Sequence, residues 1–151
     1  MINEYIEDES AVFISFHIET GGKYCRILQI NSELFTLDKD CNKGGDTQLG
    51  VTFDCYIKPS ESEIWSDHIT KIHGLYNVYS SIVDADPLGS VWDKFILYLN
   101  ENIPIGKQGV LVAWNGDTCD MEWCYRVMYG PNATVSFPRQ LQLFMDPLEI
   151  I

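Results

Sequence analysis

The feature that most constrains the fold is a short apolar run near the N-terminus, residues 11–18 (AVFISFHI). Every second position in this run is strongly apolar, as in a β-strand with a buried face. Two of the alternate positions, Ala11 and Phe13, are also apolar, as in a central strand covered on both faces. A chain of 151 residues, of which 46% are hydrophobic, is long enough to bury such a strand in the core of a single domain.

Two further apolar runs, residues 26–37 and 51–57, are predicted as strands, and the polar residues 38–50 between them are predicted as a long loop. Because polar and turn-forming residues separate these three strands, we expect an antiparallel meander. The apolar period then changes to that of a helix. The expected buried face of this helix consists of Leu88, Val91, Trp92, Phe95 and Leu99.

The remaining third of the chain predicts another strand and another helix. Residues 109–114 form a short apolar run of the buried-strand type, and Asp117 or Thr118 is the predicted N-cap of the helix that follows. A last short helix or strand is expected over residues 140–145. The predicted apolar face of the helix is Met121, Cys124, Tyr125 and Met128. Three strands, a helix, a strand and a helix together predict an α/β domain with a mixed sheet.

The composition limits the classes of partner. The chain has 22 acidic and 10 basic residues, a formal net charge of -12 and an isoelectric point near 4.4. Nucleic-acid-binding proteins usually carry a basic surface, whereas this charge repels phosphate on average. We therefore expect at most weak binding of single-stranded nucleic acid, and a protein partner is the alternative.

The cysteines and the N-terminus indicate an intracellular protein, cytoplasmic or nuclear. The number of cysteines is five, and none of them form a C-x-x-C pair, so a structural zinc site or a full disulfide framework is not expected. Residues 1–10 are acidic and polar, unlike a signal peptide, and we expect them to be an extension preceding a domain over residues 11–151. No apolar run is long enough to span a membrane.

Polar residues lie at the end of the predicted strand over residues 11–18 and shortly after the one over residues 109–114. His17 and Glu19 lie two positions apart at the end of the first strand, so their side chains point to the same face, and Thr20 and Gly21 follow them. Asp120 comes shortly after the strand at 109–114, near the start of the predicted helix. The sequence therefore predicts that Glu19 and Asp120 converge at one end of the sheet.

These stretches resemble the first two motifs of the DEDDh family of 3′→5′ exonucleases. Residues 16–22 (FHIETGG) match the Asp-x-Glu motif with His17 in place of the aspartate, and residues 114–120 (WNGDTCD) match the second motif, with Asn115 in its turn. Residues 69–75 (ITKIHGL), which contain His73, resemble a third segment that lies near the substrate in the family. The resemblance implies a ribonuclease-H-like mixed sheet, with the three-stranded antiparallel meander and one or more parallel strands flanked by helices.

The resemblance also implies a site. Members of the family hold two divalent metals, magnesium or manganese, between carboxylates, and the metals activate water for attack on a phosphodiester. Glu19 and Asp120 stand at catalytic metal-binding positions, with His17 at a third. The positions that match substrate-binding segments are Thr20, Gly21, His73 and Asn115. The family's last motif, a general-base histidine followed by an aspartate, has no counterpart, because no histidine follows His73. The expected fold is therefore incomplete at its C-terminus.

Two residues of this site have alternative interpretations. His17 is either a half-buried, hydrogen-bonded histidine at a strand end or a ligand of a single metal together with Glu19 and Asp120. An imidazole carries no negative charge and suits magnesium poorly. Asp120 is either a metal ligand or a structural carboxylate that interacts with the positive end of its helix.

Three functions are consistent with the sequence. The first is a degenerate, catalytically inactive exonuclease domain related to nucleic-acid metabolism. The second is a fragment of an active metal-dependent exonuclease that a downstream His/Asp motif would complete. The third is an acidic protein-interaction module on the same fold.

Overall fold

The computed structural model describes residues 11–22, 27–37, 46–60, 64–75, 80–116, 118–130, 133, 135–136 and 138–150. The expected N-terminal extension, residues 1–10, lies outside the described residues. So do Asp117, one of the two predicted helix caps, and the cysteines at positions 25 and 41.

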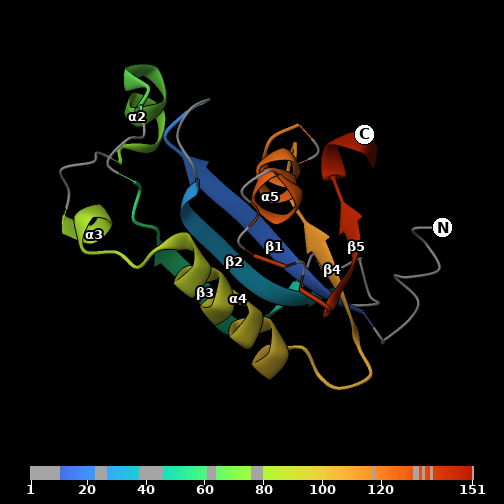
Figure 1. Ribbon diagram of the computed structural model, residues 1–151. Coiled ribbons are helices and arrows are strands. Elements are labelled where there is room, and N and C mark those ends of the chain that lie inside the picture. The colour runs from blue at the N-terminus through green and yellow to red at the C-terminus, as the bar shows by residue number, and fades with distance from the viewer. Residues whose placement is uncertain are drawn as a thin grey trace.

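A mixed sheet of five strands forms the centre of the fold (Figure 1). Strands β1 (Ala11–Thr20), β2 (Ile27–Leu37) and β3 (Asp46–Tyr56) make the predicted antiparallel meander. Strands β4 (Gln108–Val112) and β5 (Leu141–Met145) extend the sheet in parallel beside β1. The strand order is β3-β2-β1-β4-β5, so β1 is central as its sequence predicts.

The third strand begins earlier than the sequence indicates. Residues 46–50, predicted as part of a polar loop, belong to β3, and Thr47 and Asp46 pair with Thr36 and Leu37 of β2. Because β3 lies at the edge of the sheet, its polar residues can be accommodated there. Hydrophobic patterning therefore located the apolar half of this strand only.

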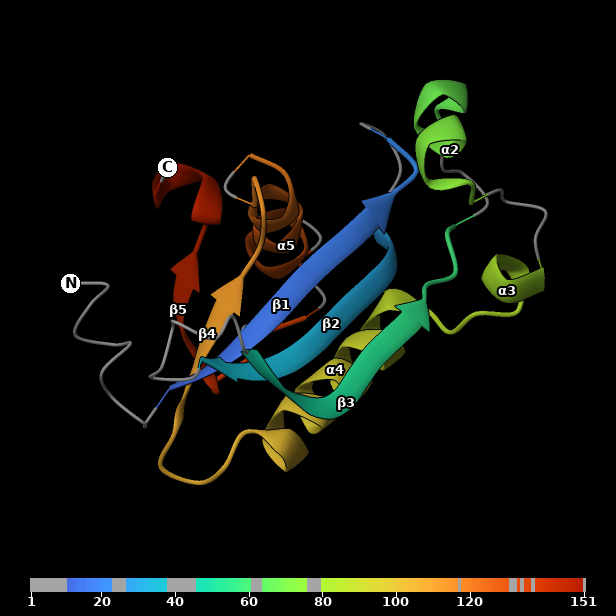
Figure 2. The ribbon, with the colours of Figure 1, turned by 180° about the vertical axis from the view of Figure 1, so that it is seen from behind.

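The helices occupy the segments after the meander. They are α2 (Asp67–His73), α3 (Ser80–Val83), α4 (Leu88–Asn102) and α5 (Asp120–Tyr129), and the 3-10 helix η2 (Pro147–Ile150) follows β5. The long helices α4 and α5 lie on the same face of the sheet, and the view from behind shows the sheet in front of them (Figure 2). In the part of the chain described, no helix has the length and apolar character needed to cross a membrane.

The hydrophobic core lies between this face and the two helices. Phe16 of β1 packs on Phe95 of α4, which also contacts Trp92, Phe53 and Tyr98 in an aromatic cluster. All five residues of the predicted face of α4 are buried. On the opposite face of the sheet, Ala11, Phe13 and Val110 form a smaller buried cluster. Both faces of β1 are thus apolar and buried near its beginning.

Helix α5 differs from its prediction at its start and in one residue of its apolar face. It begins at Asp120, with Cys119 rather than Thr118 at the N-cap position and no side-chain cap. The Thr118 hydroxyl instead donates to Asn115 Oδ1 at 2.8 Å, so Thr118 stabilises the preceding turn. Of the predicted apolar face, Tyr125 is 63% exposed and stacks on Tyr129, whereas Cys124 and Met128 are buried.

Candidate functional site

The candidate site lies where β1 extends beyond its neighbour β4. The parallel pairing of β1 with β4 reaches Ser15, so the next residues of β1 have no strand partner on that side. The carboxylate of Asp120, the first residue of α5, takes this place. Its Oδ1 accepts the Ile18 backbone N–H at 2.8 Å, and Asp120 is only 2% exposed. A helix terminus is thereby joined to the end of the central strand.

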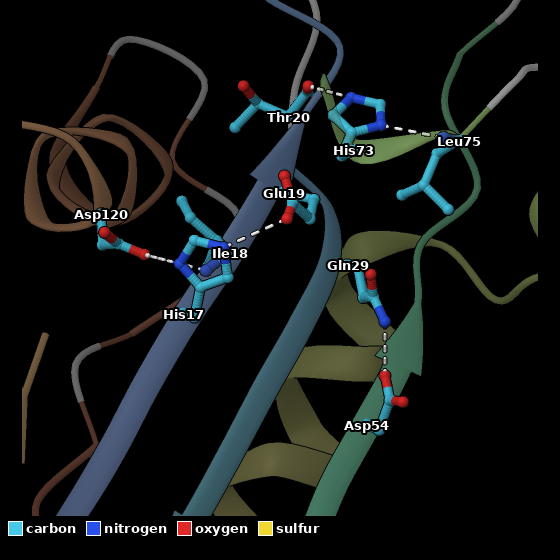
Figure 3. Close-up of polar contacts among 9 residues, drawn as sticks. All are labelled: His17, Ile18, Glu19, Thr20, Gln29, Asp54, His73, Leu75 and Asp120. Atoms are coloured by element: carbon cyan, nitrogen blue, oxygen red, sulfur yellow. Dashed lines mark hydrogen bonds and ion pairs between the residues drawn. The ribbon is translucent and has the colours of Figure 1, made fainter. Parts of the chain in front are cut away.

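His17 lies between the two carboxylates of the site (Figure 3). Its Nε2 donates to Glu19 Oε1 at 3.1 Å, and its Nδ1 lies 3.4 Å from Asp120 Oδ1. His17 and Glu19 are two positions apart on β1 and point to the same face. The His17 side chain is 61% exposed, so it is only partly buried. It is hydrogen-bonded at a strand end, as one interpretation of the sequence expected.

The surroundings of His17 favour its charged form. The interaction with Asp120 contributes most to raising the pKa of His17 from 6.5 to about 9, and the hydrogen bond to Glu19 adds to it, while partial burial opposes the shift. With such a pKa the imidazole is protonated at neutral pH and both ring nitrogens carry a proton. The side chain is then a cation held between two carboxylates.

This arrangement does not fit a magnesium or manganese ion. Hard cations prefer several oxygen ligands, and an imidazole nitrogen suits them poorly. Within the described ranges, no group of three or more His, Cys, Asp or Glu side chains is arranged to hold a metal ion. The imidazole of His17 contacts the same carboxylates, Glu19 and Asp120, that a metal would need.

Other chemical groups near the site are poor nucleophiles or bases. Cys119 lies beside Asp120 and is exposed, but burial of its thiol and the nearby carboxylates raise its pKa. The Cys124 thiol is buried, and burial raises its pKa to about 12. A thiol reacts as the thiolate, so neither cysteine is activated. Glu122 is engaged in an ion pair with Arg126 one helical turn later.

The end of β1 is attached to α2. His73 Nδ1 accepts the Leu75 backbone N–H at 2.9 Å, so Nε2 carries the proton that is donated to the Thr20 carbonyl oxygen, also at 2.9 Å (Figure 3). The Ser66 N–H donates to the Gly21 carbonyl oxygen at 2.8 Å. The predicted residues Thr20, Gly21 and His73 therefore do come together, through the backbone of the strand end.

Glycine is required directly after this segment. Gly22 has a φ of +111°, and a Cβ atom placed there would lie 2.8 Å from Cβ of Ser66. Only glycine adopts this conformation readily and leaves the space. The loop therefore approaches α2 more closely than any other residue type would allow.

The turn between β4 and α5 carries the last predicted residue. Asn115 has a φ of +53°, and its N–H donates to Asp146 Oδ1 at 3.0 Å. Its side-chain Oδ1 accepts a hydrogen bond from the hydroxyl of Thr118 within the turn. The contact of Asp146 with this turn was not predicted from the sequence. The available signal was an aspartate followed by proline at the end of an apolar run.

The comparisons with known proteins identify the fold. No protein-family model matches the sequence, and no curated protein is significantly similar to it. Among solved structures, a crystal structure of exonuclease I in complex with an inhibitor has a TM-score of 0.67 at 12% identity and covers 95% of this chain. The nuclease domain of 3′hExo, a DEDDh family member bound to rAMP, has a TM-score of 0.58 at 14% identity and covers 84% of this chain.

A third structure, exonuclease I from Methylocaldum szegediense, has a TM-score of 0.63 at 14% identity and covers 93% of this chain. This chain spans 30% and 28% of the two exonuclease I chains and 65% of the 3′hExo nuclease domain. The fold is therefore that of the DEDDh exonucleases, in their ribonuclease-H-like mixed sheet, as the motifs predict.

The raised pKa of His17 predicts how stability depends on pH. The folded state binds this proton more tightly than the unfolded state, so the contribution is fully present below pH 6.5 and is lost as the pH rises through about 9. Because the side chain is mostly exposed, solvent screening reduces the contribution to about 1 kcal/mol. Urea unfolding should therefore show a loss of stability between pH 6.5 and 9.5 in the wild type that is absent in His17→Gln. Parallel curves for the two proteins would contradict the prediction.

Proposed function

We propose that this chain is an exonuclease-fold domain that does not cleave phosphodiesters by the metal-dependent route of its structural relatives. The observation that carries the proposal is the position of His17 between Glu19 and Asp120, within 3.1 and 3.4 Å of their oxygens. In place of mobile divalent metals, the site has a cation that belongs to the chain. Glu19 and Asp120 then stabilise the strand end instead of holding metals that bind the reacting phosphate.

The charge balance of the site supports this proposal. Two metals at such a site would bring four positive charges to stabilise an attacking and a leaving oxygen. One imidazolium brings a single charge, and two carboxylates, Glu19 and Asp120, already surround it. The net charge of the three side chains is therefore negative, so they offer no excess positive charge to a phosphate.

The contacts of His73 and His17 support it further. His73 uses both ring nitrogens in contacts with the backbone of Thr20 and Leu75, and His17 is occupied by the carboxylates. The third histidine, His68, lies on α2 and is exposed, and the sequence has no histidine beyond position 73. The alternative, an active exonuclease completed by further chain, would still have to displace His17 from the centre.

The first prediction concerns activity. With magnesium or manganese, the purified chain should degrade end-labelled single-stranded DNA and RNA no faster than Glu19→Ala does, because base assistance, worth about 10²–10⁴ in rate, and the metals are both lost. The Glu19→Ala protein serves as the matched control for a contaminating nuclease, since a contaminant would act equally in both preparations. Wild-type degradation that Glu19→Ala abolishes would overturn the proposal.

The second prediction concerns metal affinity. His17→Asp replaces the internal cation with a carboxylate beside Glu19 and Asp120, so manganese binding measured by calorimetry should tighten by about tenfold or more. His68→Asp makes the same substitution at an exposed position of α2 and is the matched control. Equal manganese affinity in the two variants would show that His17 does not exclude the metal.

We further propose that nucleic acid binds weakly and that a protein is the more favourable partner. The formal charge is -12, and Lys94, one of the 10 basic residues, is paired with Asp86. At physiological salt and without added metal, the dissociation constant for a single-stranded oligonucleotide measured by fluorescence anisotropy should be weaker than about 1 μM, and the affinity should fall further with salt. Tighter binding that persists at high salt would show that net charge does not govern this surface.

A further inference from the structure

We propose that Asp146 is the positioning residue that holds Asp120 at the end of β1. The proposal rests on the site described above, since it explains how that site is assembled. The connection runs from the end of β5, through the turn between β4 and α5, to the first residue of α5. Each step is a backbone contact or a close approach in the structure.

The first step is the contact of Asp146 with the turn. Asp146 follows β5 directly and is 6% exposed, and its Oδ1 accepts the N–H groups of Asn115 and Leu148, both at 3.0 Å. A buried carboxylate is stable only with hydrogen-bond donors, and bonds from backbone N–H groups to a charged oxygen are strong. Asp146 therefore fixes the turn after β4 to the end of β5.

The second step is the conformation of the turn. Asn115 has a φ of +53°, a left-handed conformation that residues other than glycine adopt only where surrounding contacts stabilise it. Two such contacts are present, from its N–H to Asp146 and from the Thr118 hydroxyl to its Oδ1. Loss of the contact with Asp146 removes the hydrogen bond that connects Asn115 to the residue directly after β5.

The third step couples the position of the turn to the position of helix α5. The carbonyl oxygen of Gly116 accepts the N–H of Met121 at 2.8 Å, within the first turn of α5. A Cβ atom at Gly116 would lie 2.5 Å from Cβ of Ala113 and 2.9 Å from the ring of Phe144, so the turn is packed against β4 and β5. A displaced turn therefore displaces the beginning of α5.

The final step is the carboxylate of Asp120. It is the first residue of α5, and its Oδ1 lies 2.8 Å from the Ile18 nitrogen. Hydrogen-bond strength falls steeply as distance and angle depart from these values. A displacement of the helix start on the order of 1 Å would break this bond. The Ile18 amide thus reports directly on whether Asp120 is in place.

Amide hydrogen exchange of the full chain, followed by NMR, tests the proposal. The measured quantity is the protection of Ile18 divided by that of Ile30, its partner across the β1–β2 ladder. In Asp146→Ala the ratio should fall by about tenfold or more, because Ile18, unlike Ile30, should lose its hydrogen bond to a charged acceptor. In Asp146→Asn, which keeps an acceptor oxygen for Asn115, the ratio should stay within about twofold of the wild type.

Two controls separate positioning from general stability. Val91→Ala removes two buried methyl groups from α4, a helix separate from the turn. It should lower the protection of Ile18 and Ile30 together, because it weakens the core as a whole. Asp86→Ala removes an exposed carboxylate paired with Lys94 and should leave the ratio unchanged. Where Asp146→Ala does not fold, Asp146→Glu, which displaces the carboxylate by one methylene, should lower the ratio while Asp146→Asn does not.

An unchanged ratio in Asp146→Ala, or in Asp146→Glu where that variant is used, would overturn the proposal. The proposal would also be overturned if Val91→Ala lowered the ratio as much as Asp146→Ala does. The same holds if Asp146→Asn lowered the ratio as much as Asp146→Ala. The measurement needs neither metal nor substrate. Nuclease activity in the wild type would therefore refute the proposed function and leave the role of Asp146 to be decided by the exchange ratio alone.

Discussion

The buried carboxylate of Asp120 is the interaction on which the site depends. It accepts the Ile18 N–H at the point where β1 has passed the end of β4, and it pairs with the imidazole of His17. A carboxylate with 2% exposure must be stabilised by donors, because burial of an unpaired charge is very costly. The position of α5, the side-chain orientation of His17 and the charge of the centre all follow from this requirement.

Much of the fold could be predicted because it depends on local patterns. Apolar residues on both faces of residues 11–18 place β1 at the centre, and the apolar face of α4 is buried throughout as its spacing indicates. The convergence of Glu19 and Asp120 on His17 follows from the parallel pairing of β1 with β4, since Glu19 lies near the end of β1 and Asp120 begins the helix that follows β4. Such features require only periodicity and topology.

The details of the site could not be predicted, because they depend on contacts between distant segments. Whether His17 points at a metal or at Asp120 is decided by a residue 103 positions away on α5. Threonine is a common N-cap residue, but Thr118 belongs to the turn that Asp146 stabilises, and the helix begins only at Asp120. The beginning of β3 was similarly missed, because residues 46–50 lack the apolar pattern by which a strand is recognised.

The cation of this site is covalently part of the protein, and this has a consequence for its occupancy. A bound metal is in equilibrium with the solution, so chelators and competing ions change how often it is present. His17 cannot dissociate, and the chain holds it next to Glu19 at a constant and high local concentration. If the site works as proposed, the structure of this strand end should therefore not depend on divalent ions and should not change on addition of EDTA.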